Sequence, residues 1–177
     1  MRGAAVWTLV GMLGISLQAM LAAALPVALV PDLSLLAAFA AALVLGRAHG
    51  LIVVCLLGLG SDMVSGSLLG QHAFVRVLEF LFVRAVAGQL DLRRAFPQVF
   101  VAFALSVLDS TLMAGLALVF VPAFPVAWSE VGALLGRAAV TAVLAPLVCG
   151  AAGTLSEGMS AIEGRREMRL ETRRPIL

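Results

Sequence analysis

The sequence predicts an all-α membrane protein, built as a bundle of six transmembrane helices joined by short loops. The chain has 177 residues, of which 62% are hydrophobic and 12% are charged, and its mean hydropathy is +1.10. Soluble domains are about 45–50% apolar, so a soluble core could not hide this much apolar surface. At about 20 residues per span, this length accommodates about six helices and leaves no room for a second, soluble domain.

Six apolar segments support this count, with breakers between them. The segments cover approximately residues 4–25, 33–45, 51–64, 73–90, 97–121 and 131–153. Turns are expected where proline, glycine and serine gather, as at Pro26, at Pro31 and over residues 65–70. The second and third segments are short for full spans and could form one hairpin, so five spans remain an alternative. We predict a transmembrane domain over 1–155 and an Arg-rich cytoplasmic tail over 156–177, which could be a surface helix.

Arginine placement orients the chain in the membrane. With the N-terminus inside, the inner side holds Arg2, Arg47, Arg93, Arg94, Arg165, Arg166, Arg169, Arg173 and Arg174. The outer turns, over 26–32, 65–72 and 122–130, contain no arginine. Cytoplasmic loops of membrane proteins are enriched in Arg and Lys. Both termini are therefore expected in the cytoplasm.

The sequence points away from catalysis. It has no P-loop, HExxH or GxSxG motif and no cluster of metal ligands. Cys55 and Cys149 lie in apolar runs, where small packing residues are common, and do not suggest a disulfide framework. A net charge of +2 does not indicate a nucleic-acid partner. We therefore predict no enzyme activity, no cofactor and no metal.

Four charged residues are predicted to meet inside the membrane: Arg76, Glu79, Asp109 and Arg137. At 1.5 Å per residue, three of them lie at similar depth in different helices, and Glu79 is one turn from Arg76. Charged groups at this depth are costly and mark function or pairing. Each acid has a candidate base, which favours a neutral network that fixes helix register. Recognition of a partner helix, and ion or proton transport through Asp109, are the alternatives.

The turn after the third segment is the second candidate site. It contains Asp62, Ser65, Gly66, Gly70 and His72. The Asp62 carboxylate is suited to accept hydrogen bonds from turn amides or to cap the following helix. The two glycines allow backbone conformations closed to other residues. A stabilised turn is the simplest interpretation, and direct contact with a partner is the other.

This region also carries a family resemblance. The run from Gly58 to Ala73, GLGSDMVSGSLLGQHA, resembles the MreD family of rod shape-determining membrane proteins. That family typically shows a glycine-bearing apolar helix, an acid, and a short Gly/Ser turn with Leu-Gly and often His-Ala. The Pro31-Asp32-Leu33 sequence before the second segment is also similar to the family. The charges of the fourth segment, including Arg84, depart from the family pattern.

The resemblance implies a non-enzymatic scaffold of lateral peptidoglycan synthesis in the bacterial cytoplasmic (inner) membrane. Its expected partners are MreC, RodA, a class B penicillin-binding protein and MreB, with anionic lipid at the arginine-rich tail. The layout is also similar to that of the substrate-binding subunits of energy-coupling-factor transporters. A small-molecule binding subunit is therefore the alternative function, with Asp62, Gln71, His72 and Glu79 as its few candidate ligand residues.

Overall fold

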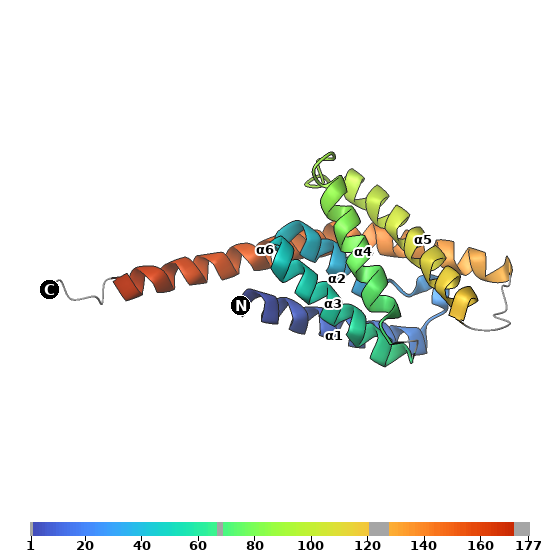
Figure 1. Ribbon diagram of the computed structural model, residues 1–177. Helices are drawn as coiled ribbons and strands as arrows, with labels where there is room; N and C mark the ends of the chain where they lie inside the picture. The colour runs from blue at the N-terminus through green and yellow to red at the C-terminus, as the bar shows by residue number, and fades with distance from the viewer. Residues whose placement is uncertain (1, 67–68, 121–127, 172–177) are drawn as a thin grey trace.

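The computed structural model describes residues 2–66, 69–120 and 128–171, with side chains described over 3–66, 69–116, 118–120 and 131–161. Within these ranges all regular structure is helical, which confirms the predicted all-α class (Figure 1). The elements are α1 (Arg2–Ala24), the short 3-10 turn η1 (Val27–Leu29), α2 (Leu33–Val44), α3 (Arg47–Ser65), α4 (Gln71–Val86), α5 (Ala95–Phe120) and α6 (Trp128–Glu171).

Five segments in the described part of the chain are long and apolar enough to cross a membrane. They are Gly3–Ala24, Val27–Val44, Arg47–Ser65, Ala95–Phe120 and Val131–Ala161. Helix α4 is not among them, because its 16 residues are fewer than the roughly 20 that a span needs. The count of six spans and the cytoplasmic placement of both termini stay predictions.

The short helix α2 forms the centre of the bundle. Helices α1, α3, α4 and α6 all pack against it. Its start is set by Asp32, whose side chain accepts a hydrogen bond from the Leu35 amide at 2.9 Å, as an N-cap residue does. Most of its residues are buried, including Phe39 and a run of alanines over 40–42. A helix that is apolar on all sides suits this central position.

Helices α3 and α4 form a tightly packed hairpin, and two glycines of α3 permit the close approach. A Cβ atom at Gly58 would overlap the backbone of Ala73 in α4. A Cβ atom at Gly50 would lie 2.5 Å from the ring of Phe80. Gly58 therefore lets α3 pack closely on α4.

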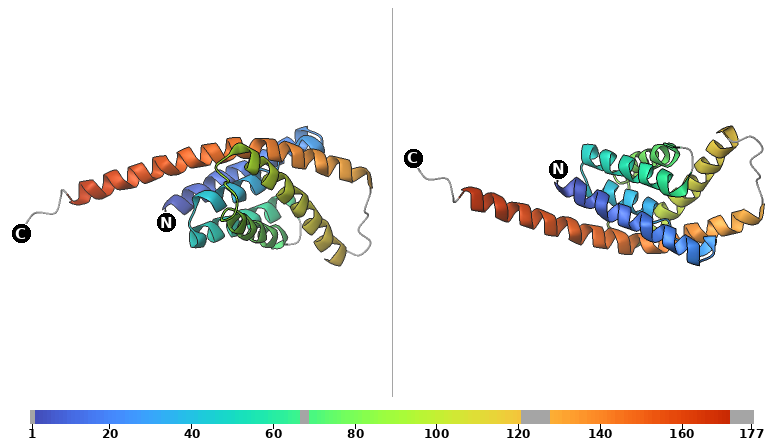
Figure 2. Two further views of the ribbon diagram at one scale, coloured as in Figure 1. Left: turned by 90° about the horizontal axis from the view of Figure 1, so that it is seen from above. Right: turned by 90° about the horizontal axis from the view of Figure 1, so that it is seen from below.

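Helices α5 and α6 form a second pair. Helix α5 packs mainly on α6 and makes fewer contacts with α4. Helix α6 packs in turn on α2 and η1, where a Cβ atom at Gly136 would lie 3.0 Å from that of Ala28. The two views of Figure 2 show the α5–α6 pair extending past the ends of α3 and α4.

Helix α6 is one continuous helix of 44 residues with Pro146 inside it. At 1.5 Å per residue it is about 66 Å long, roughly twice the hydrocarbon thickness of a bilayer. It continues through the boundary predicted at residue 155 and projects beyond the other helices (Figure 1). Arg165, Arg166 and Arg169 fall within it. Residues 122–127 of the turn predicted over 122–130, and Arg173 and Arg174, lie outside the described residues, and residues 128–130 belong to α6.

Candidate functional site: a buried charge network and a capped turn

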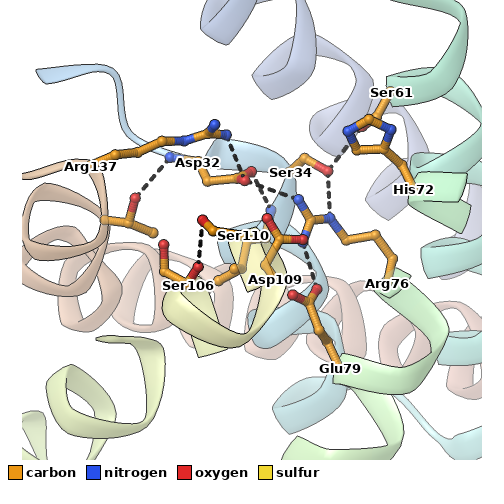
Figure 3. A network of polar contacts seen from close by, with 12 residues as sticks. Asp32, Ser34, Ser61, His72, Arg76, Glu79, Ser106, Asp109, Ser110 and Arg137 are labelled. Atoms are coloured by element: carbon orange, nitrogen blue, oxygen red, sulfur yellow. Dashed lines mark hydrogen bonds and ion pairs between the residues drawn. The ribbon is translucent and has the colours of Figure 1, made fainter. Parts of the chain in front are cut away.

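A single guanidinium, that of Arg76 in α4, lies at the centre of the bundle and is 2% exposed. Its Nε donates to Ser34 Oγ at 3.0 Å. Its Nη1 donates to Glu79 Oε2 at 2.6 Å and to Asp109 Oδ1 at 3.0 Å. Its Nη2 donates to Asp32 Oδ2 at 3.0 Å. One side chain therefore joins α2, α4 and α5 (Figure 3).

Asp32 extends the network to α6. Its Oδ2 atom also accepts a hydrogen bond from Arg137 Nη2 at 2.8 Å, and its backbone N–H donates to Thr141 Oγ1 at 2.9 Å. The same carboxylate caps α2 through Leu35. Arg137 is the most open member, with 27% of its side chain exposed against 2% for Asp32. The start of α2 is thus held by two arginines from different helices.

Ser34 extends the network to α1 and α3. Its hydroxyl lies 3.0 Å from Ser61 Oγ in α3. Its backbone N–H donates to Gln18 Oε1 of α1 at 3.2 Å. With these bonds, all six α-helices contribute a side chain to one connected set of polar contacts. Such a set resists rotation of any one helix, because rotation would leave buried polar groups without partners.

The structure brings together the four charged residues expected to cluster, and adds a fifth. Arg76 binds Glu79 and Asp109 directly, and Arg137 joins through Asp32. The network is not the neutral set of two acids and two bases expected from the sequence, because Asp32 adds a third carboxylate and all three share Arg76. From the sequence, Asp32 is expected only as part of the outer turn over 26–32. Its place after Pro31 and directly before an apolar segment is the N-cap pattern that locates it at a helix start.

The network holds one more carboxylate than guanidinium groups. Its ion pairs involve three acids, Asp32, Glu79 and Asp109, and two bases, Arg76 and Arg137. The Oε1 atom of Glu79 is buried and accepts no hydrogen bond within the described residues. No group of three His, Cys, Asp or Glu in the described part of the chain is arranged to hold a metal ion. The arrangement is suited to holding helices together.

Arg84, one of the additional charges in the fourth segment, lies outside this network. Its Nη1 donates to the carbonyl oxygens of Ala42 at 3.1 Å and Leu45 at 3.0 Å. These carbonyls belong to the C-terminal end of α2, which lacks helical partners for them. Arg84 therefore caps α2 from a neighbouring helix, so arginines hold both ends of the short central helix.

The second site is the turn between α3 and α4, which is organised by Asp62. The side chain of Asp62 is fully buried. Its Oδ2 accepts from the Gly70 amide and its Oδ1 from the His72 amide, each at 2.8 Å. His72 Nδ1 lies 2.8 Å from the same Oδ1 atom. Since Gly70 is the N-cap residue of α4 and has no side chain, Asp62 supplies the cap from the preceding helix.

The glycines of this turn adopt conformations that other residues rarely take. Gly66 ends α3 with φ of 64°, and its amide donates to the Asp62 carbonyl. Gly70 has φ of 94°. Both values lie in the left-handed region that favours glycine. Ser65 is exposed, and its Oγ lies 3.5 Å from the same carbonyl of Asp62. Both sequence-based interpretations of Asp62, turn acceptor and helix cap, describe contacts that are present.

Replacing Asp62 by alanine is expected to destabilise the α3–α4 hairpin. The substitution leaves two amides of the α4 N-terminus without an acceptor, and a lost cap costs about 0.5–2 kcal/mol. Thermal unfolding in detergent, followed by size-exclusion chromatography, measures the loss. Asp62→Asn keeps one acceptor oxygen and should fall between Asp62→Ala and wild type. Equal stability of all three proteins would contradict the capping role.

Comparison with known proteins supports the resemblance of the turn sequence. The family model described as rod shape-determining protein MreD matches residues 2–149. No curated protein and no solved structure matches the chain significantly. The matched range includes both polar sites and the five membrane-spanning candidates up to the middle of α6. The chain therefore belongs to the MreD family of rod shape-determining membrane proteins.

Proposed function

We propose that this protein is a non-enzymatic scaffold of the machinery that elongates rod-shaped bacteria. The proposal rests on the hydrogen bonds of the buried Arg76 guanidinium within the bundle. Its nitrogens donate to Ser34, Asp32, Glu79 and Asp109, and the side chain is sealed from solvent. A network engaged within the bundle favours a rigid platform over a binding site for substrate. A rigid platform is what helix docking between membrane proteins requires.

The proposed partners are those that the family resemblance implies. The membrane-spanning segment of MreC would dock on the helix faces near the Ser65–Gly70 turn. RodA and the class B penicillin-binding protein would assemble on the same bundle, and MreB would meet the complex from the cytoplasm. Apolar side chains on α4 and α5, such as Phe74, Phe82 and Phe100, are exposed and are available for such contacts. The arginine-rich end of α6 would contact anionic lipid.

The geometry does not favour a small-molecule binding subunit. Such a site needs polar groups that face a cavity. Of the four candidate ligand residues, Asp62 and Glu79 are buried and engaged by His72 and Arg76. Gln71 lines an outer groove of about 350 Å³, whose other lining residues are apolar or glycine. Transport through Asp109 is likewise not favoured, because that carboxylate is held by Arg76.

Depletion of the protein in a rod-shaped host tests the scaffold. Loss of the protein should make cells wider and shorter until they round up, and microscopy of cell width and length measures this. Wild-type protein and the control Arg94→Ala should both restore the rod, since the Arg94 side chain is 81% exposed. Unchanged width and length after depletion would rule the scaffold out.

Affinity purification in mild detergent tests the partners separately. We expect MreC, RodA and a penicillin-binding protein to be recovered with the tagged chain and identified by mass spectrometry. Recovery of paired transporter ATPases with a coupling protein would instead support the transporter alternative. Asp62→Ala should reduce MreC recovery more than it reduces the amount of folded protein. A loss in strict proportion to folded protein would limit that turn to a structural role.

A further inference from the structure

A narrow apolar slot runs between α1 and α6. Its volume is about 250 Å³, and all the residues that line it are apolar. Gly11 and Gly14 form the α1 wall, Leu36 and Ala37 of α2 form the floor, and Leu147 and Ala151 form the α6 wall. Figure 2 shows α1 and α6 running beside each other over α2. The slot therefore follows the helix axes through the apolar part of the bundle.

One end of the slot is closed by a tryptophan. Trp7 is 4% exposed and packs in one cluster with Ala152 and Leu155 of α6. Among the described residues its indole Nε1 is the one buried side-chain donor without an acceptor. Trp7 lies five residues, or about 7.5 Å, from the first residue of α1, at the depth where tryptophans meet the membrane interface.

The closed end lies on the arginine-bearing side of the bundle. The cluster around Trp7 also includes Leu45, which is two residues before Arg47 at the start of α3. A neighbouring cavity at this side joins Arg93 to Glu157 of α6. The slot thus extends from the side where basic side chains gather toward the apolar middle of the bundle. Phospholipid head groups and ester oxygens lie at this level of a bilayer.

The volume of the slot indicates what kind of molecule can occupy it. An α-helix 10–12 Å across takes up roughly 400–600 Å³ per turn, so the slot is too small for one turn of a partner helix. Apolar cavities of about 150 Å³ already admit a molecule such as benzene. The slot therefore suits a single hydrocarbon chain. Trp7, by bridging α1 to α6, also prevents a helix from entering at this end.

We propose that the slot holds one acyl chain of a phospholipid from the leaflet on the arginine-bearing side. The chain lies on Leu36 and Ala37 and contacts the ring of Trp7, with the head group of the same lipid on the arginine-bearing side. Small residues, Gly11, Gly14 and Ala151 among them, line the slot and leave its volume to an occupant. The bound lipid becomes part of the surface that α1 and α6 present.

Fluorescence quenching by a brominated lipid tests the proposal. Trp128→Phe leaves Trp7 as the only tryptophan, because the chain contains two. The intact protein, purified in detergent, is titrated with phosphatidylcholine that carries a dibromostearoyl chain. We expect saturable quenching of Trp7 at about one lipid per protein. In the same background Ala151→Leu, which fills the slot from an exposed position, should weaken lipid binding at least tenfold.

Ala104→Leu is the matched control. Ala104 is also an exposed alanine within a membrane-spanning helix, but it does not line the slot. The Trp7 fluorescence of this variant should be quenched as in the background protein. The thermal unfolding of the background protein and of both leucine variants should be the same. Quenching that rises linearly with lipid and is the same in Ala151→Leu would show contact with bulk lipid only and would overturn the proposal. Equal loss in both leucine variants would overturn it as well.

Discussion

Replacing Arg76 by alanine is expected to remove most of the folded protein from the membrane. The substitution leaves Asp32, Glu79 and Asp109 without their shared partner, in an interior where each is at least nine-tenths buried. Removing one partner of a buried ion pair costs about 3–5 kcal/mol, which is a large share of the stability of a typical domain. The yield of monodisperse protein in detergent and its midpoint of thermal unfolding measure the effect.

Arg94→Ala is the matched control, because it breaks an ion pair with Asp91 on an exposed surface. Exposed ion pairs contribute little, so this variant should behave as wild type.

A second set of variants separates the effect of the lost charge from the effect of the lost side-chain volume. Arg76→Met combined with Asp32→Asn, Glu79→Gln and Asp109→Asn should recover part of the stability lost in Arg76→Met alone. Wild-type stability of Arg76→Met alone would show that the ion pairs do not hold the bundle together.

Replacing Gly58 by alanine is expected to force α3 and α4 apart. The added Cβ atom would overlap the backbone of Ala73, which has no rotamer by which to move aside. Overpacking costs about 1–3 kcal/mol and sometimes more. The hairpin also carries Asp62 and the start of α4, so the cap at Gly70 should be lost with it. Thermal unfolding in detergent should show a lower midpoint, and limited proteolysis should show earlier cleavage in the α3–α4 turn.

Gly115→Ala tests the geometric cause of this effect. Gly115 is a helical glycine of α5 whose added Cβ atom would have no neighbour within 4 Å among the described residues. Alanine favours helix over glycine by about 1 kcal/mol, so this variant should equal or exceed wild type in stability. Similar destabilisation by both substitutions would mean that the α3–α4 distance is not what Gly58 controls.

The helices could be predicted from the sequence because apolar runs and breakers are local signals. The second apolar run, over 33–45, corresponds to α2 within one residue. The third helix begins at Arg47, earlier than expected, because residues 47–50 form its first turn although they are not part of the apolar run. The end of α6 was not predictable from hydropathy. The composition becomes more polar near residue 155, but Glu, Met, Arg and Leu are good helix formers and continue the helix.

The contacts within the two sites divide in the same way: local contacts could be predicted from the sequence, and contacts between distant helices could not. Asp62 and the glycines act within one turn, so their spacing in the sequence was sufficient to predict the contacts. Arg76 and Glu79 are one helical turn apart, so their contact could also be predicted from their spacing in the sequence. The bond between Asp32 and Arg137 joins residues 105 positions apart, and it depends on how α6 rotates against α2. The predicted depth of a residue in the membrane limits which residues could pair with it, but it does not identify the pair.

The position of Asp32 before α4 in the chain has a consequence for biogenesis. Helix α4 carries Arg76 and Glu79 and is too short and charged to enter lipid alone. When α4 enters the translocon, Asp32 has already left the ribosome, whereas Asp109 and Arg137 have not yet emerged from it. The first counter-ion is thus present at the moment of insertion, and the later helices complete the neutralisation. Asp32→Asn should therefore delay the integration of nascent chains that end after α4, while Asp109→Asn should leave that step unchanged.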